Sequence, residues 1–286
     1  MPELPEVEVA ARQLRAWCVG RRIVEARAAR TRVIRGQQPR RLGELAGHTL
    51  LDVERAGKWL LLSFDGAEGL LSHLGMAGRW THRATAQAPA SHVRATLVLD
   101  DASSLDYRDP RMFGRLVRGQ VDALRGLPAW RTLGPDALDG IDVDRLQRLL
   151  ARTRRSVKEA LMDQRVLAGL GNIYVAEALH RGGLHPARAA HSLSRGEVER
   201  LAAAIGDALR FALSLEEGPQ PVAHFEERGD NEFLVYGHEG GPCRGCAGRI
   251  ERIVQGGRST FLCPRCQPAG RARRKRPALR QGRQKR

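Results

Sequence analysis

The chain has 286 residues, 42% of them hydrophobic, which is enough for two domains and a sizeable core. Lysine and arginine outnumber aspartate and glutamate by 48 to 32, so the net charge is +16. This excess favours a polyanionic partner such as a phosphate backbone, with a merely solvated basic surface as the alternative. No stretch approaches the roughly 20 apolar residues of a membrane span, and the acidic, proline-rich start is unlike a signal peptide, so we expect a cytoplasmic protein.

The first eight residues, MPELPEVE, place the imino acid Pro2 close to the carboxylic acids Glu3 and Glu6. Removal of Met1 would leave Pro2 with a free secondary amine beside Glu3, and Glu6 follows three residues after Glu3. An α-amino group titrates near ~7.7–8.0, so a useful fraction is nucleophilic at neutral pH. Such an amine beside an acid suits attack on a sugar carbon to give a Schiff base. The alternative is a Pro-x-x-Pro start that only positions the first helix.

Residues 3 to 18 are predicted to form a helix, because Val7, Ala10, Leu14 and Trp17 recur at helical spacing. Short apolar segments then follow without intervening helices, at residues 23–24, 59–64, 70–74 and 96–99. Turn residues separate them, as in the pair Asp65-Gly66. This pattern predicts an antiparallel β-sandwich that, with its leading helix, forms an N-terminal domain over residues 1–125.

Glycines and prolines predict a linker over residues 126–142, after which helical periodicity returns. A helix is expected at 144–151, and Ser156 with Glu159 has the form of a capping box that opens another. The same form recurs at Ser194 and Glu197, before a long amphipathic helix, and the turn 169–172 leads into a helix at 173–179. Helix pairs joined by glycine turns form a compact module over residues 143–217, whose turn amides can face phosphate.

Four of the five cysteines form two Cys-x-x-Cys pairs, which lie 16 residues apart: Cys243, Cys246, Cys263 and Cys266. This spacing is typical of a tetrahedral zinc site, and four protein ligands make the ion (one Zn²⁺) structural. We therefore expect a zinc finger over residues 238–268. The fifth, Cys18, is expected to be a buried small hydrophobe. The tail, residues 269–286, carries nine lysines and arginines and no acid, which is the composition of a disordered, nucleic-acid-tethering segment.

The chain resembles the bacterial formamidopyrimidine-DNA glycosylases and their relative endonuclease VIII along all but its extreme tail. Besides MPELPEVE, the matching stretches are GKWLLL at 57–62, HLGMAG at 73–78, DPRMFG at 109–114, LGPDAL at 133–138, LMDQ at 161–164, GLGNIYVAEAL at 169–179, GLHP at 183–186 and RSTFLCPRCQ at 258–267. The start of the chain is closer to the formamidopyrimidine branch. The resemblance implies an α+β protein: a β-sandwich domain, then a helix–two-turn–helix domain with a zinc-finger hairpin.

The resemblance also implies which residues act. Pro2 matches the family nucleophile, Glu3 the acid that protonates the sugar oxygen, and Lys58 a lysine that contacts phosphate beside the lesion. A flipped-out base leaves a hole in the stack that must be filled. The remaining matches are a void-filling trio and two phosphate-gripping positions: Met76, Arg111 and Phe113, then Asn172 and Arg258.

Two departures from the family pattern bear on substrate choice. The region 218–237 lacks the Gly-Gly-Thr-Thr-Leu-type motif that covers an oxidised purine in the formamidopyrimidine branch, so it is interpreted as a shortened lesion-capping loop. Met112 stands where an arginine is usual between the two wedge positions.

The expected function is a monomeric, bifunctional DNA glycosylase and abasic-site lyase that acts on oxidised or ring-opened purines in double-stranded DNA. It would work through β,δ-elimination, need no cofactor beyond zinc and associate with the bacterial nucleoid. One alternative keeps the mechanism but acts on oxidised pyrimidines, abasic sites or another lesion. A second is a non-catalytic protein that binds damaged DNA.

Overall fold

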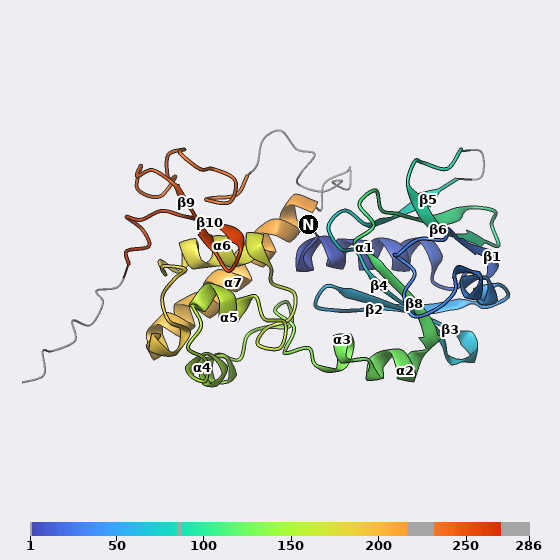
Figure 1. Cartoon of the computed structure of the whole chain (residues 1–286), viewed down its shortest axis with the longest axis horizontal. Coiled ribbons are helices and arrows are strands. Elements are labelled where there is room, and N and C mark those ends of the chain that lie inside the picture. The colour runs from blue at the N-terminus through green and yellow to red at the C-terminus, as the bar shows by residue number, and fades with distance from the viewer. Residues whose placement is uncertain (1, 85–86, 217–231, 270–286) are drawn as a thin grey trace, which may run out of the picture.

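The N-terminal half of the chain is one helix followed by a sandwich of two antiparallel four-stranded sheets (Figure 1). The structure, a computed structural model, describes residues 2–84, 87–216 and 232–269. Helix α1 (Leu4–Cys18) begins one residue later than predicted, because Glu3 is its N-cap and forms a capping box with Glu6. The first sheet has the order β1-β6-β7-β5: Ile23–Ala28, Val93–Leu99, Ser104–Arg108 and Arg79–Arg83.

The two middle strands of the second sheet are buried on both faces. Its order is β2-β3-β4-β8: Leu50–Ala56, Trp59–Phe64, Glu68–His73 and Arg115–Gln120. Leu60 and Leu62 belong to the core that the two sheets share with α1, whereas Leu61 and Leu71, paired across β3 and β4, contribute to a second apolar cluster. Burial on both faces explains why β3 is a continuous apolar run and not an alternating one.

Two short helices, α2 (Val121–Gly126) and α3 (Pro128–Arg131), lie at the junction between the halves. The sequence pattern does not predict them, since the glycines and prolines there favour a linker. Leu124 of α2 packs with Leu61 and Leu71 on the outer face of the second sheet, so burial against the sheet outweighs the weak helix preference of this segment.

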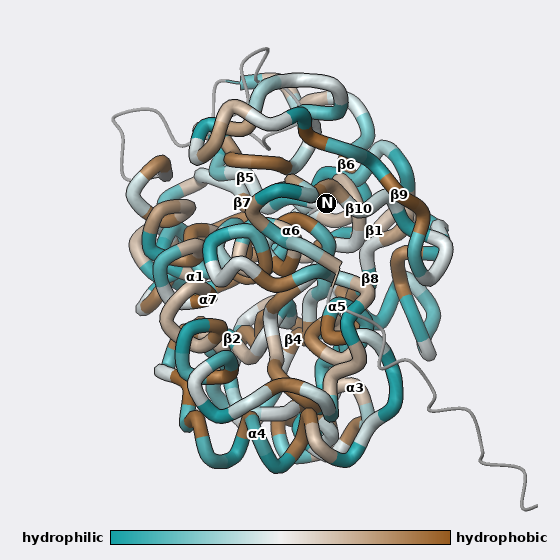
Figure 2. Tube along the Cα trace, turned by 90° about the vertical axis from the view of Figure 1, so that its left-hand side faces the viewer, coloured by the Kyte–Doolittle hydropathy of each residue, from teal (hydrophilic) through white to brown (hydrophobic). Residues whose placement is uncertain are grey.

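The C-terminal half is built from helices. They are α4 (Val143–Ala151), α5 (Val157–Leu161), α6 (Asn172–Arg181) and α7 (Arg195–Glu216). The Ser156–Glu159 capping box is confirmed at the start of α5, and at α7 the Glu197 carboxylate accepts from the Ser194 amide at 2.8 Å. In α4 the leucines Leu146 and Leu150 are buried, and Figure 2 shows hydrophobic and hydrophilic residues alternating along it. The described residues also form short 3-10 helices, of which η1 (Pro39–Leu45) and η2 (Asp65–Ala67) lie in the N-terminal half and η3 (Ala190–Ser192) in the C-terminal half.

The last described element is a hairpin of β9 (Glu251–Gln255) and β10 (Arg258–Leu262). It packs beside α6, with Ala176 of that helix in one apolar cluster with Ile250 and two cysteines. The predicted α+β class, with a sandwich, a helical module and a zinc-finger hairpin, is therefore confirmed. Within the described residues, no helix combines the length and apolar character that crossing a membrane requires.

Candidate active site and DNA-binding surface

The start of the chain is inserted between the two halves of the molecule. The Leu4 amide donates to the carbonyl of Gly169 at 3.1 Å, and the Leu4 side chain belongs to the core of the C-terminal half. Gly169 has φ +101°, and a β-carbon there would lie 2.8 Å from the Leu4 β-carbon. Only glycine allows this close approach, so the turn 169–171 is shaped to receive the first residues of the chain.

Glu3 caps a helix that lies 170 residues further along the chain. Its two carboxylate oxygens accept from the amides of Ile173 (3.0 Å) and Tyr174 (3.3 Å), in the first turn of α6. The side chain is fully buried, and Pro2 beside it is buried too. A helix N-terminus offers unpaired amides and a positive dipole end, so α6 fixes this carboxylate next to the N-terminal imino acid.

Lys58 and Glu3 lie together on the side of Gly171 from which a side chain would project. A β-carbon at Gly171 would lie 2.5 Å from Lys58 Nζ and closer still to the Glu3 carboxyl group. Burial lowers the pKa of Lys58, while the nearby Glu3 and Glu6 oppose this shift and Arg258 adds to it. The turn between β2 and β3 therefore brings Lys58, a lysine with a lowered pKa, next to Glu3, the predicted catalytic acid.

Glu6 is a second acid at this point, and its side chain is partly buried. Its carboxylate accepts from the Glu3 amide at 2.7 Å and from the Tyr174 hydroxyl at 2.5 Å. Burial, with the charge of Glu3 as a smaller cause, raises the pKa of Glu6 to about 7, although the Tyr174 hydrogen bond works against the shift. A carboxyl group that exchanges protons near neutrality thus lies within one helical turn of Pro2.

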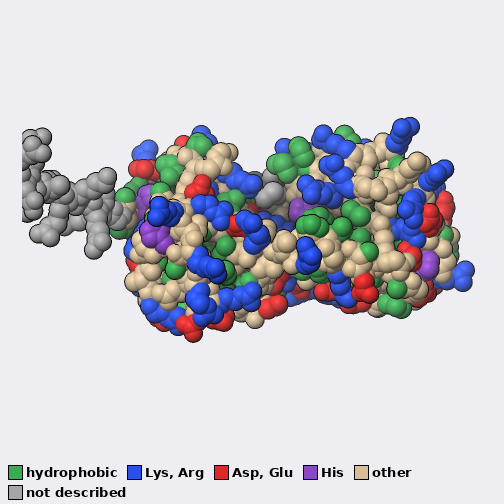
Figure 3. Space-filling view, turned by 60° about the horizontal axis from the view of Figure 1, so that its bottom comes forward, with side chains coloured by type: hydrophobic (Ala, Val, Ile, Leu, Met, Phe, Trp, Pro, Cys, Tyr) green, Lys and Arg blue, Asp and Glu red, His purple; other side chains and the backbone are tan. Residues whose placement is uncertain are grey.

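An open cleft of about 650 Å³ gives access to this cluster, with Lys58, His73, Gly171 and Arg258 in its wall. Figure 3 shows the hollow between the two halves, with Lys and Arg side chains on both sides of it. Burial, with the positive charge of Lys58 and Arg115, lowers the pKa of His73 to about 4, so its ring is neutral and its Nδ1 accepts from the Gly75 amide at 3.0 Å. The cleft is therefore a basic groove whose wall includes Lys58 and Gly171, the residues next to the buried Glu3 carboxyl group.

The predicted void-filling residues lie on two adjacent loops of the N-terminal half. Met76 follows β4, and Arg111 and Phe113 lie between β7 and β8. A β-carbon at Gly75 would lie 2.5 Å from the Gly114 amide nitrogen, so the two loops touch along their backbones. The Phe113 side chain is 47% exposed, and the Arg111 guanidinium lies 5.5 Å from its ring centre.

The two predicted phosphate-gripping residues lie where the C-terminal helices meet the zinc hairpin. Asn172 Nδ2 donates to the Ser259 carbonyl at 2.9 Å, and its Oδ1 is buried without a partner among the described residues. Arg258 is exposed at the start of β10.

Lys158, which sequence reasoning missed, is fully buried and donates to the Ser259 carbonyl (3.2 Å) and the Thr260 hydroxyl. As the second residue of a capped helix, it gives no sequence signal beyond that of a surface charge.

The four predicted cysteines converge as expected, with all Sγ atoms within 4.8 Å of one another. The Sγ separations of Cys243–Cys266 and Cys246–Cys263 are 3.8 and 3.5 Å. Tetrahedral zinc with bonds of about 2.3 Å needs sulfur–sulfur separations of about 3.8 Å, so the residues fit one structural Zn²⁺. His180 Nε2 lies 3.8 Å from Cys243 Sγ, which places α6 directly against the metal site.

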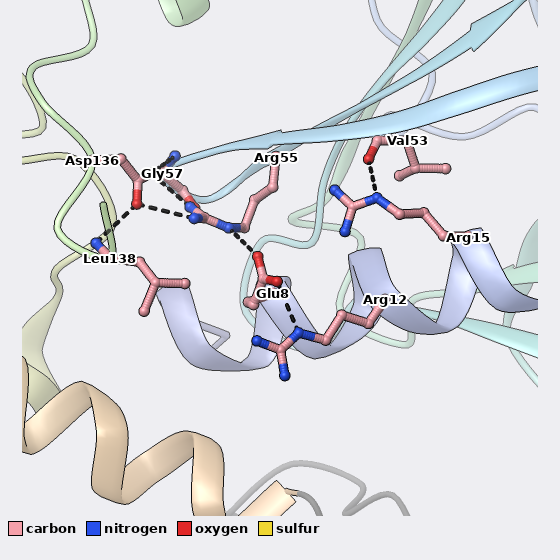
Figure 4. Close-up of polar contacts among 8 residues, drawn as sticks. All are labelled: Glu8, Arg12, Arg15, Val53, Arg55, Gly57, Asp136 and Leu138. Carbon is pink, nitrogen blue, oxygen red and sulfur yellow. Dashed lines mark hydrogen bonds and ion pairs between the residues drawn. The ribbon is translucent and has the colours of Figure 1, made fainter. Parts of the chain in front are cut away.

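A buried ion-pair network joins the two halves behind the active site, as Figure 4 shows. Arg55 donates to Glu8 of α1 (2.7 Å) and forms two bonds with Asp136 (2.6 and 3.0 Å). Asp136 also accepts from the amides of Gly57 (2.7 Å) and Leu138 (3.0 Å). The network thus connects α1, the turn that carries Lys58 and the first residues of the C-terminal half.

Two predicted segments lie wholly or mostly outside the described residues. These are the shortened capping loop, of which the structure describes only 232–237, and the basic tail, of which it describes only residue 269. Within the first, Phe233 is buried, and its ring lies 6.1 Å from that of Tyr174 in an edge-to-face arrangement. The end of the capping region is therefore anchored on α6, the helix that Glu3 caps.

Comparison with known proteins accounts for nearly the whole chain. Family models match in three places: the formamidopyrimidine-DNA glycosylase N-terminal domain at residues 1–116, the H2TH domain of the same glycosylase at 133–221, and a zinc finger found in FPG and IleRS at 240–269.

Individual proteins agree with the family models. The formamidopyrimidine-DNA glycosylases of Methylococcus capsulatus and Cereibacter sphaeroides (strain ATCC 17029) are 41% and 39% identical, each over 93% of this chain and all of the relative. Among solved structures, Lactococcus lactis FPG in complex with FAPY-dG-containing DNA superimposes with a TM-score of 0.84 at 29% identity, covering 93% of this chain and all of that one. The chain therefore belongs to the formamidopyrimidine-DNA glycosylase family.

Proposed function

We propose that this protein is a base-excision repair DNA glycosylase with abasic-site lyase activity, acting on oxidised or ring-opened purines. The observation that carries the proposal is the seating of Pro2 and Glu3 at the N-terminus of α6, facing Lys58 at the end of a basic cleft. Family membership supports it, and so does the ring-opened guanine in the DNA bound by the Lactococcus lactis relative.

In the proposed reaction the Pro2 nitrogen, once Met1 is removed, attacks C1′ of the damaged nucleoside. The N-glycosidic bond breaks, the base leaves with its electron pair, and a carbon–nitrogen bond to Pro2 replaces it. Glu3 donates a proton to the sugar oxygen, so the ring opens and a Schiff base forms. Loss of the 3′ and then the 5′ phosphate by β- and δ-elimination follows, and hydrolysis of the imine returns the amine.

The surrounding residues would hold the substrate. Lys58, at the end of the cleft, meets the phosphate beside the lesion. Asn172 and Arg258, where α6 meets the zinc hairpin, grip the same strand, and the exposed Arg258 guanidinium offers N–H donors to its phosphates. Zinc supplies no step of the chemistry; it holds the hairpin that carries Arg258. The net charge of +16 supports association with the nucleoid.

The wedge loops complete the proposal. Double-stranded DNA must lose one base from its stack, and a side chain must occupy the vacated place. The exposed Phe113 ring and the Met76 side chain on the adjoining loop are apolar groups of the N-terminal half that could occupy this place. Arg111, beside Phe113, would approach the base opposite the lesion. The protein would do this as a monomer, because both halves of the site come from one chain.

Borohydride trapping tests the proposal on three duplexes, which carry 8-oxoguanine opposite cytosine, dihydrothymine, or an abasic site. Borohydride reduces a Schiff base to a stable amine, so covalent adducts with the abasic and 8-oxoguanine duplexes are expected. An adduct with the dihydrothymine duplex in place of 8-oxoguanine would move the substrate to oxidised pyrimidines. Tight binding without any adduct, after removal of Met1 has been verified by mass, would leave a damage-binding protein without chemistry.

A further inference from the structure

The loop that carries Phe113 is held in an unusual backbone conformation. Met112 has φ 57°, a left-handed value that costs energy in a residue other than glycine. The buried Asp109 side chain offsets this cost, since it accepts from the amides of Arg111 (3.1 Å), Met112 (2.9 Å) and Gly114 (2.8 Å). The loop amides are thus held from inside the fold.

The carbonyls of the same loop are held from outside by one side chain, Arg32. Its Nε donates to the Met112 carbonyl and its Nη2 to the Arg111 carbonyl, both at 3.0 Å. Its guanidinium also lies 5.2 Å from the centre of the Phe113 ring, within the range of a cation–π contact. One planar group therefore bonds the main chain before the ring and touches the ring itself.

Arg32 is in turn carried by a fixed segment. The flanking Val33 and Ile34 are buried, and the Leu116 amide at the start of β8 donates to the Val33 carbonyl at 2.8 Å. The Arg35 amide donates to the Leu116 carbonyl at 3.0 Å, so residues 33–35 run along β8 as an added edge. The base of the Arg32 side chain is therefore held at one place relative to the wedge loop.

We propose that Arg32 is a positioning residue for base eversion: it keeps the Phe113 ring raised at the surface so that the ring can enter the DNA stack. This rests on the proposed function. Arg111 and Arg32 both contact the ring, but only Arg32 is bonded to the loop carbonyls, so it can stay in place when Arg111 turns towards DNA. Without this support, an exposed aromatic ring lowers its free energy by packing flat against the protein surface, because less of its apolar area then faces water. A ring in that position would not project towards the DNA.

The test compares Arg32→Ala with a control, Arg30→Ala. Arg30 is two residues away and exposed, and its side chain takes no part in these contacts, so the control removes the same charge without them. Single-turnover excision is measured on duplex DNA that carries 8-oxoguanine, or whichever oxidised base the unmodified protein excises. Strand cleavage is measured on single-stranded DNA with an abasic site, which needs no eversion. A 2-aminopurine beside the lesion reports, by its fluorescence, when the wedge enters the stack.

Arg32→Ala is expected to slow duplex excision and the 2-aminopurine signal by about three- to tenfold, the size expected for two surface hydrogen bonds and a cation–π contact. Cleavage of the single strand should stay unchanged, and Arg32→Lys, which keeps the charge but not the planar fork, should recover less than half of the loss. Equal effects of Arg32→Ala and Arg30→Ala, full recovery in Arg32→Lys, or an equal loss on the single strand would overturn the proposal. Failure of the unmodified protein to cleave the single strand would instead count against the proposed function.

Discussion

Removing Arg55 should destabilise the protein far more than removing Arg12, although both arginines bond the same carboxylate. Arg55 and Arg12 donate to the two oxygens of Glu8 at 2.7 and 2.9 Å. Their surroundings differ: the Arg55 side chain is 6% exposed and the Arg12 side chain 49%. Arg55 also forms the paired bonds to Asp136 that join the two halves of the molecule.

The magnitudes follow from these surroundings. In Arg55→Ala two carboxylates, each less than 14% exposed, lose their buried partner, and such a loss costs roughly 3–5 kcal/mol. In Arg12→Ala an exposed pair one helical turn apart is lost, which costs about 0.3–0.5 kcal/mol. The two variants should therefore differ by at least about 2 kcal/mol in free energy of unfolding. Salt at 1 M should remove the smaller effect and leave most of the larger one, because buried pairs are little screened.

Urea unfolding followed by tryptophan fluorescence measures this difference. The variants are compared with the same m-value, the slope of unfolding free energy against urea concentration. Equal destabilisation by Arg55→Ala and Arg12→Ala would refute the reasoning, because the network would then behave as a surface ion pair. Arg55 also lies three residues before Lys58, so a destabilised network should lower the rate of strand cleavage at an abasic site as well.

Three further outcomes follow from the site. Burial raises the pKa of Glu6 to about 7, so between about pH 4.5 and 7 the folded protein keeps a proton that the unfolded chain has released. The free energy of unfolding should therefore fall by up to about 3 kcal/mol as the pH rises to 7. Urea unfolding of Glu6→Gln should not show this fall. Gly171→Ala, whose β-carbon would displace the catalytic acid and Lys58, should slow abasic-site cleavage about 100-fold in a gel assay while zinc content stays normal. Cys263→Ser should lose its zinc to a chromogenic chelator much faster than the unmodified chain, whereas Cys18→Ser should keep it, since the Cys18 thiol instead bonds the Leu14 carbonyl.

Features governed by neighbouring residues could be predicted from the sequence. Helix α1 follows from apolar spacing, the Ser156 capping box from two residues three apart, and the convergence of the cysteines from their spacing. In each case the physical cause lies within a few residues of its effect, or in metal-ligand geometry that tolerates few spacings. The family resemblance added the order of the domains and the candidate site residues.

Features governed by distant partners could not be predicted in this way. Glu3 caps a helix that begins at Asn172, and Arg55 meets Asp136 some 81 residues later, so no local pattern marks either contact. Lys158 sits where a helix usually carries a solvated charge, and only the packing of the zinc hairpin buries it. Helix α2 forms because the outer face of the second sheet needs cover, which is a property of the sheet and not of the segment itself.

The assignment of Pro2 as the nucleophile is the central claim, and peptide mapping of the borohydride-trapped adduct tests it most directly. The adduct on abasic DNA is digested, and the modified peptide is sequenced by mass spectrometry, in parallel with a chain extended at its N-terminus so that the Pro2 nitrogen is an amide. We predict that the sugar remnant is on the Pro2 nitrogen, and that the extended chain binds the DNA but gives no adduct. An adduct on Lys58, or an undiminished adduct with the extended chain, would contradict this assignment.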